Sequence, residues 1–290
     1  MRVTLDHWTT YRYHSAVTLN PHTVRLQPRM SGTQWLLAFS LEIRPTPAGT
    51  AECLDQDGNL AHYAWFAAPT QELSIRTRST VRLLRENPFD FLLGKDPLRL
   101  PLWYQEPLSS SLFAYRLTNQ IGSPVKDFAL GIAAGAKGEA LAFLTALNRE
   151  LHTTCRQLTR PDGPAWRSDE TLRLRQGACR DLAVLFCDAC RVMGIAARFV
   201  SGYECASAGR SDSYMHAWAE VYLPNAGWRG YDPSRGLAVS NAHVAVAAGF
   251  DFELAAPISG TFTGTGGATM TASIVMNAEP DATQPPVPLL

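Results

Sequence analysis

The chain has 290 residues, of which 46% are hydrophobic and 18% charged, and its 26 basic and 26 acidic residues leave no net charge. With an isoelectric point near 7.0, the chain has no overall field to attract nucleic acid or an anionic membrane, so neither is expected as a partner. The sequence begins without the apolar segment of a secretory signal, and no apolar run approaches the roughly 20 residues of a membrane span. Six cysteines in such a chain are expected to be reduced thiols, which favours a cytoplasmic protein.

The first part of the chain has the pattern of short strands and turns. Apolar and polar residues alternate over 11–15, 35–43, 60–66 and 73–83, as they do in half-buried strands. The Asp57-Gly58 pair between two of these runs is typical of a β-hairpin. We therefore predict a β-sandwich-like or barrel-like domain over residues 1–105, with no chemical cluster of its own.

A connector and a helical region follow. Prolines at 88, 97, 101, 107 and 124 make residues 86–124 a connector. From Val125 to Leu158 apolar residues recur at three- and four-residue spacing, which indicates helices interrupted near Gly135 and Gly138. We assign residues 106–277 to a second domain and expect 278–290, a proline-rich tail, to be disordered.

The stretch QGACRDLA, residues 176–183, places one cysteine at the start of a helix. Apolar residues from Leu182 to Met193 form a helical stripe, and Gly194 is a typical end for that helix. Cys179 is therefore expected in the first turn, where free N–H groups and the helix dipole favour the thiolate. Cys187 and Cys190 lie further along the helix and are interpreted as small buried hydrophobic residues.

Two strands are predicted after this helix. The run AARFVSGY covers 196–203, and SYMHAWAEVYLP, 213–224, alternates large polar residues with small apolar ones. His216 projects from the second strand, and Asp232 follows in WRGYDPSRG. A thiol, an imidazole that takes its proton and a carboxylate that orients the imidazole are what thiol acyl transfer requires.

The two side chains meet only in one hairpin register. If Tyr222 pairs with Trp228, the connection is Leu223–Gly227, Trp218 faces Asp232, and His216 is its diagonal neighbour. A slip of one residue turns Asp232 to the opposite face of the sheet. We therefore predict the Tyr222–Trp228 register.

The sequence resembles the transglutaminase-like cysteine hydrolase superfamily. The resemblance is carried by GACRDLAVLFCDACRVMGIAARFVSGY and HAWAEVYLPNAGWRGYDPSRG, and less strongly by VRLQPR, PTP, DQDGN and ELSIRTRSTV, which resemble the β-rich N-terminal domain of bacterial members. It implies an α+β protein in which the cysteine-bearing helix packs on the antiparallel sheet of a papain-like core. It also implies a triad of Cys179 as nucleophile, His216 as base and Asp232 as orienting carboxylate.

The resemblance implies a hydrolase that cleaves a peptide or protein amide through an acyl-thioester, with transamidation as the alternative. The backbone N–H of Cys179 is the natural first oxyanion donor. Gln176 is a candidate second donor, and Trp166 and Trp218 are candidates for lining the substrate groove. No cofactor and no metal are expected, since no acidic cluster has a calcium-binding spacing.

Two further classes remain open on the sequence alone. One is a zinc protein, with Cys179, Cys187, Cys190, Cys205 and His216 as candidate ligands. Their spacing lacks the second closely spaced pair of ligands that is typical of a zinc site. The other is a non-catalytic binding module. The sequence does not indicate the oligomeric state or the physiological substrate.

Overall fold

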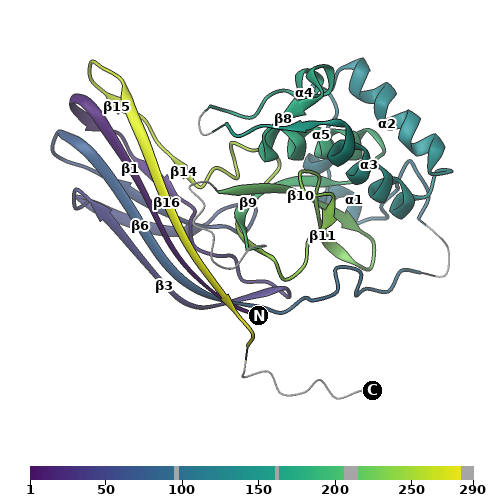
Figure 1. The fold of residues 1–290 in the computed structure, drawn as a ribbon, viewed down its shortest axis with the longest axis horizontal. Coiled ribbons are helices and arrows are strands. Elements are labelled where there is room, and N and C mark those ends of the chain that lie inside the picture. Colours follow the sequence, from purple (N-terminus) through teal and green to yellow (C-terminus); the bar gives the residue numbers. More distant parts are fainter. Residues whose placement is uncertain (95–97, 161–162, 206–214, 282–290) are drawn as a thin grey trace.

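The computed structural model of the protein describes residues 1–281 except 95–97, 161–162 and 206–214. Figure 1 shows a long, curved β-sheet on one side and a lobe of helices and a second large sheet on the other. None of the described helices has the length and apolarity needed to cross a membrane. The protein is α+β and rich in strands, with antiparallel pairing in each of its larger sheets.

The N-terminal part forms two antiparallel sheets. The first has the order β15-β1-β6-β3, with β16 also paired to β1; the second has the order β14-β2-β5-β4. Their strands are β1 (Arg2–Leu19), β2 (His22–Val24), β3 (Gln34–Arg44), β4 (Gly49–Leu54), β5 (Leu60–Trp65), β6 (Thr70–Leu83), β14 (Ile258–Ser259), β15 (Phe262–Thr263) and β16 (Ala268–Glu279). Val17, Val24 and Ile75, from both sheets, belong to one buried cluster, as in a sandwich. The predicted hairpin at Asp57-Gly58 joins β4 to β5, and Gly58 has a φ of 73°.

The C-terminal strands do not follow the predicted division at residue 277. β16 pairs with β1 from Tyr13↔Ala268 to Arg2↔Glu279, and β14 pairs with β2. The last strands therefore complete the N-terminal sheets, and the beginning of the predicted tail belongs to β16. The alternation of Met270, Ala272 and Ile274 is a strand pattern, but their position in the chain led to their assignment to the second domain, whereas β16 pairs with β1. Residues 282–290 of the predicted tail lie outside the described residues.

The described part of the connector holds the short helix α1 (Leu108–Ser111), a 3₁₀ turn at Ala114–Arg116 and, at its end, the start of α2 (Ser123–Gly135). After α2 come α3 (Ala140–Thr154), β7 (Arg156–Gln157), α4 (Ser168–Leu174), β8 (Gln176–Gly177) and α5 (Cys179–Val192). The predicted interruption lies between α2 and α3, where Lys137 and Gly138 have φ values of 53° and 68°.

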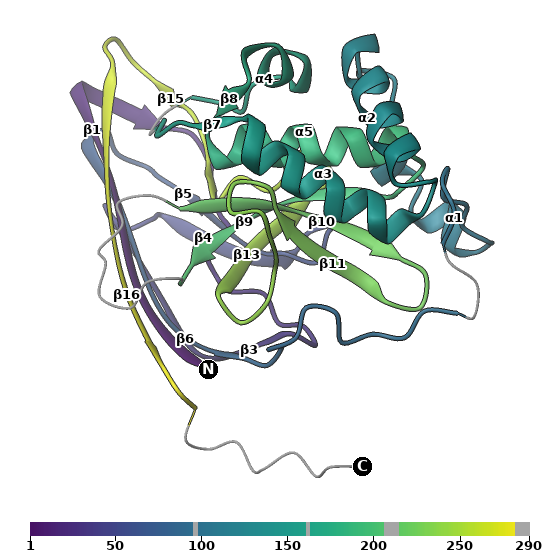
Figure 2. The ribbon, with the colours of Figure 1, turned by 45° about the vertical axis from the view of Figure 1, so that its right-hand side comes forward.

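The second large sheet has the order β12-β11-β10-β9-β13. Its strands are β9 (Ala197–Glu204), β10 (His216–Leu223), β11 (Gly227–Asp232), β12 (Leu237–Ala238) and β13 (His243–Gly249). Figure 2 shows the helices layered over this sheet, with α5 next to it. Ala217, Ala219 and Val221 of β10 are buried, and these small side chains let α5 approach the strand closely.

The two parts share one buried cluster. Leu5 and Val81 of the curved sheet join Ala183 of α5, Phe199 of β9 and Val244 of β13 in it. The curved sheet therefore packs directly on the elements that carry the candidate site.

Candidate active site

Cys179 is the first residue of α5, as predicted, and its side chain is partly exposed. An N–H group in the first turn of a helix has no acceptor within that helix. The backbone N–H of Cys179 is therefore available to an oxygen bound beside the thiol. Cys187 and Cys190 are buried in the helical core, where burial raises the pKa of Cys187 to about 12 and that of Cys190 well above its ordinary value.

Asp181 fixes the loop that presents Cys179. Its side chain is fully buried, and Oδ2 accepts a hydrogen bond of 2.7 Å from the backbone N–H of Ala178. Oδ1 accepts from the backbone N–H of Trp166 at 2.8 Å and from the Arg160 guanidinium at 2.7 Å. A Cβ on Gly177 would meet Cβ of Asp181 at 2.8 Å, so glycine is required for this close approach. Asp181 was not among the residues identified from the sequence, although an acidic residue three positions into a helix is a common capping signal.

The predicted hairpin register is confirmed. Tyr222 pairs with Trp228 and Ala219 with Tyr231, which brings His216 and Asp232 to the same face. Nε2 of His216 lies 2.6 Å from Oδ2 of Asp232. The other ring nitrogen, Nδ1, is thereby left for the Cys179 thiol.

The electrostatics of the pair favour charge on both partners. Burial alone would lower the pKa of His216, but the hydrogen bonds to Asp232 and Cys179 outweigh it and raise that pKa to about 10. Burial alone would raise the pKa of Asp232, but hydrogen bonds from His216 and His243 hold it well below its usual range. Such an environment keeps a carboxylate beside an imidazolium at neutral pH.

His243, on β13, is a second imidazole at the same carboxylate and was not identified from the sequence. Its Nε2 lies 3.0 Å from Oδ2 of Asp232. Oδ1 of Asp232 accepts from the hydroxyl of Ser234 at 2.7 Å and from the backbone N–H groups of Ser234 and Arg235 at 3.0 and 3.1 Å. A histidine at the start of an apolar strand carries no pattern of its own, so only the sheet topology reveals its position.

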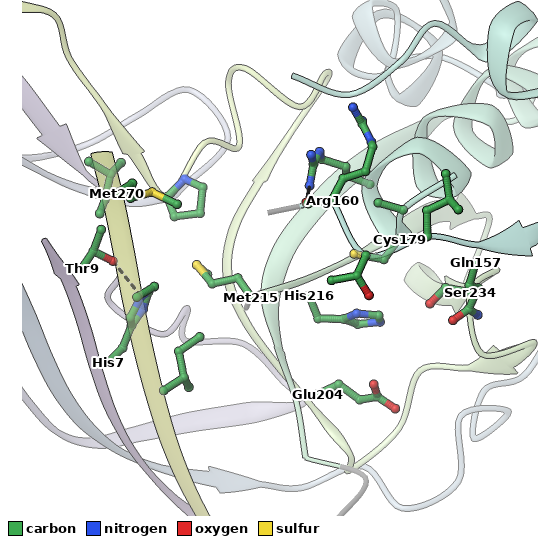
Figure 3. Close-up of a pocket in the computed structure, with 18 of the residues that line it drawn as sticks. His7, Thr9, Gln157, Arg160, Cys179, Glu204, Met215, His216, Ser234 and Met270 are labelled. Atoms are coloured by element: carbon green, nitrogen blue, oxygen red, sulfur yellow. Dashed lines mark hydrogen bonds between the residues drawn. The ribbon is translucent and has the colours of Figure 1, made fainter. Parts of the chain in front are cut away.

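Cys179 and His216 face a cleft of about 430 Å³ between the two parts of the molecule. In Figure 3, Cys179 and His216 lie on one side of this cleft, and His7, Thr9 and Met270 of the curved sheet lie on the other. Burial lowers the pKa of His7 to about 4, so its ring is neutral at neutral pH. The remaining lining residues include Tyr11, Gln157, Arg160, Arg180, Glu204, Met215, Ser234, Arg235, Ile258, Ile274 and Met276.

The other predicted site residues are placed differently. Gln176 is not among the residues that line the cleft, and its side-chain oxygen accepts a hydrogen bond of 3.2 Å from Arg156. Trp166 stacks on Arg160, 4.3 Å from its guanidinium carbon to the ring centroid, and lines a different pocket. Trp218 is 1% exposed and packs under the imidazoles, 5.1 Å from the ring of His243 and 6.3 Å from that of His216. Neither tryptophan lines the groove that contains Cys179.

A different glutamine reaches the cleft. Gln157 of β7 pairs with Gly177 of β8 in a parallel register, and the backbone N–H of Leu158 donates to the carbonyl of Gly177 at 2.9 Å. Gln157 lines the cleft beside Cys179 (Figure 3). Because Gln157 is far upstream of Cys179 in the chain, the motif around the cysteine does not identify it.

Among the described residues, the side chains considered as zinc ligands do not lie together at one site. Cys187 and Cys190 lie in the core beneath the helices, whereas Cys179 and Cys205 pack against a different cluster. The only described group with the geometry for a metal is His216, Asp232 and His243, whose candidate ligand atoms lie within 4.8 Å of one another. The two hydrogen bonds to Oδ2 of Asp232 account for that convergence without an ion.

Comparisons with known proteins agree with this architecture. Residues 126–233 match the model of the transglutaminase-like superfamily, and residues 3–82 match that of the bacterial transglutaminase-like N-terminal region. An uncharacterized protein of Mycobacterium tuberculosis is 29% identical over 275 residues, covering 89% of this chain and 87% of the relative. An uncharacterized protein of Mycobacterium leprae is 25% identical over 272 residues, covering 91% of this chain and 94% of the relative. The crystal structure of a candidate cysteine protease from Cytophaga hutchinsonii covers 99% of this chain and 93% of its own, with a TM-score of 0.71 and 18% identity, a likeness of fold.

Proposed function

This chain belongs to the transglutaminase-like superfamily and carries the bacterial N-terminal region found with it, and we propose that it is a cysteine-dependent hydrolase of peptide or protein amide bonds. The observation that carries the proposal is the 2.6 Å hydrogen bond between His216 and the buried Asp232, in a cleft that also contains Cys179 at a helix N-terminus. A buried carboxylate that holds one nitrogen of an imidazole leaves the other nitrogen directed at a thiol.

The first chemical step is acylation of Cys179. The thiolate attacks the carbonyl carbon of the amide, and the carbonyl oxygen becomes an oxyanion. The backbone N–H of Cys179 is the first donor to that oxyanion, and we propose the side-chain amide of Gln157, in place of Gln176, as the second. The imidazolium of His216 gives its proton to the leaving amine, and the acyl-thioester remains on Cys179.

The second step is hydrolysis. His216, now neutral, takes a proton from water as the water attacks the thioester carbonyl. Collapse of the second tetrahedral intermediate releases the carboxylic acid and restores the thiolate and imidazolium. Asp232 remains ionised throughout and stabilises the imidazolium.

The cleft favours substrates with apolar groups beside the amide. Arg160 is paired with Asp181 at 2.7 Å and Arg235 with Glu204 at 2.6 Å, so these charges are compensated inside the protein. The facing wall of the curved sheet presents Met270, Ala272 and Met276 beside the polar side chains of His7 and Thr9. Contact with this wall stabilises a bound substrate by burial of apolar area.

The test is an unbiased screen of amide and peptide substrates with wild type and Cys179→Ala. Wild type should release amine and acid, and Cys179→Ala should bind but not turn over. Asp232→Asn should lower the rate without abolishing it. Adding His216→Ala to Cys179→Ala should lower the turnover rate little further, because the residues act as a unit. Equal turnover by wild type and Cys179→Ala would refute the proposal.

A further inference from the structure

Asp232 holds two imidazoles with one oxygen. His216 and His243 come from different strands, and their Nε2 atoms lie 2.6 and 3.0 Å from Oδ2 of Asp232. The carboxylate is completely buried and His243 is 4% exposed. The triad is thus extended by a group that does not line the cleft and has no place in the two chemical steps.

The hydrogen bond to Asp232 places a proton on Nε2 of His243. An ionised carboxylate only accepts hydrogen bonds, so Nε2 of His243 carries the proton that it donates to Asp232. Nδ1 of His243 is buried with no hydrogen-bond partner among the described residues. A buried donor or acceptor left unsatisfied costs about 1–3 kcal/mol. An apolar side chain at this position would avoid that cost, so the imidazole is not explained by stability.

The N-terminal part of the chain helps to fix the position of His243. One edge of β13 pairs with β9. On the other side, Gln34 exchanges two hydrogen bonds with the backbone of Ala245, at 2.8 and 2.9 Å. Asn59 does the same with Ala248, at 2.7 and 2.8 Å. Both amides belong to the N-terminal part, which therefore holds the strand that presents His243.

We propose that His243 is a positioning residue for the candidate triad, an inference that rests on the proposed function. Its Nε2–H holds Oδ2 of Asp232, while Ser234 and the backbone N–H of Arg235 hold Oδ1. With both oxygens held, the carboxylate has one orientation, and His216 is directed with Nδ1 toward Cys179. Without this donor the buried carboxylate is less compensated and its Oδ2 is held by His216 alone, so the imidazole of His216 is directed at the thiol less often.

The test compares His243→Leu with His243→Gln. Leucine fills the space under Trp218 and removes both ring nitrogens, including the unsatisfied one. Glutamine retains an N–H donor near the position of Nε2. The measurement is the rate at which iodoacetamide alkylates Cys179 at pH 6, read by peptide mass spectrometry, together with thermal unfolding and metal content of each protein. His243→Met is a second apolar variant if His243→Leu does not fold, since methionine adapts to irregular spaces.

We expect His243→Leu to unfold at or above the unfolding temperature of wild type. Iodoacetamide should nevertheless alkylate its Cys179 about tenfold more slowly than in wild type, as is common when a residue that orients a functional side chain is lost. His243→Gln should recover most of the rate. Wild-type or faster alkylation in His243→Leu, or equal loss in both variants, would overturn the proposal. So would stoichiometric zinc in the wild type that His243→Leu lacks, because the cluster would then be a metal site. If wild-type Cys179 itself reacts no faster than exposed Cys53, the proposed function fails instead.

Discussion

At the scale of single residues, we expect Cys179 to be more reactive than the other five cysteines. Cys179 lies at a helix N-terminus beside His216, whereas burial raises the pKa values of Cys155, Cys187, Cys190 and Cys205. We predict that brief iodoacetamide treatment at pH 6 modifies Cys179 first and exposed Cys53 more slowly. Peptide mapping by mass spectrometry measures both, and preferential labelling of any of these four thiols would contradict the assignment.

The same reaction has a predicted pH profile. Because the pKa of His216 is raised to about 10, the imidazolium persists at neutral pH and is lost only as the pH rises through that value. The low pKa of Asp232 keeps its carboxylate ionised as the pH falls. The alkylation rate of Cys179 should therefore change little between pH 6 and 9 and move to a second plateau only as the pH rises through about 10. In His216→Ala, alkylation of Cys179 should instead be slow at pH 6. Its rate should increase as the pH rises through the ordinary pKa of a thiol, about 8.5.

Asp181 offers a further prediction at the residue scale. Asp181→Ala leaves the N–H groups of Ala178 and Trp166 without their acceptor and Arg160 without its buried partner. Breaking such a buried pair costs about 3–5 kcal/mol. Chemical denaturation should show this loss, and Cys179 should become less reactive because its loop is no longer held. Exposed Asp127 on α2 provides the control, since Asp127→Ala should change stability by no more than about 0.5 kcal/mol.

At the scale of elements, Gly202 of β9 makes room for the site. A Cβ there would meet the carbonyl oxygen of Val244 at 2.1 Å and the ring of Trp218 at 2.5 Å. Gly202→Ala must therefore displace β13 or the tryptophan that packs under His216 and His243. We predict a loss of about 3 kcal/mol in unfolding free energy together with slower alkylation of Cys179. Gly131→Ala, in α2 with no atom outside its own helix backbone within 4 Å of the added carbon, should leave the alkylation rate unchanged and raise the unfolding free energy by up to about 1 kcal/mol. If Gly202→Ala behaves like this control, Gly202 does not make room for the site.

What the sequence could predict differs between local and distant features. Helix α5 and the register of β10 and β11 follow from patterns within about fifty residues: an apolar stripe, alternation and one short connection. Gln157 and His243 reach the site through strand pairings that join segments with no shared pattern. The roles suggested for Gln176 and Trp166 relied on closeness to Cys179 in the chain, and each of these side chains points to other partners.

At the scale of the whole molecule, the N-terminal sheets contribute to the site from outside it. They form the far wall of the cleft, through His7, Thr9 and Met270, and they hold β13 through Gln34 and Asn59. The sequence suggested two successive domains. The return of β16 to pair with β1 instead makes the curved sheet a product of both ends of the chain, which local patterns do not reveal.

Asn59→Ala tests this coupling between the two parts. The substitution leaves a backbone N–H and a carbonyl of Ala248 unsatisfied in a buried position, at about 1–3 kcal/mol for each group. We predict lower stability and slower alkylation of Cys179, because β13 and His243 are less firmly held. Asn119→Ala, at an exposed position, is the matched control. A stability loss in Asn59→Ala with unchanged Cys179 reactivity would show that the two parts are not coupled at the site.

The most direct test of the account as a whole is to trap the acyl-enzyme. A substrate found in the screen is mixed with the protein, the reaction is quenched with acid within its first turnovers, and the intact protein and its peptides are weighed. We expect wild type to gain the mass of the acyl group on Cys179 and hydroxylamine to remove it, whereas Cys179→Ala should gain nothing and release no product. An acyl group on any other residue, or turnover at near wild-type rate by Cys179→Ala, would contradict the assignment of Cys179 as the nucleophile.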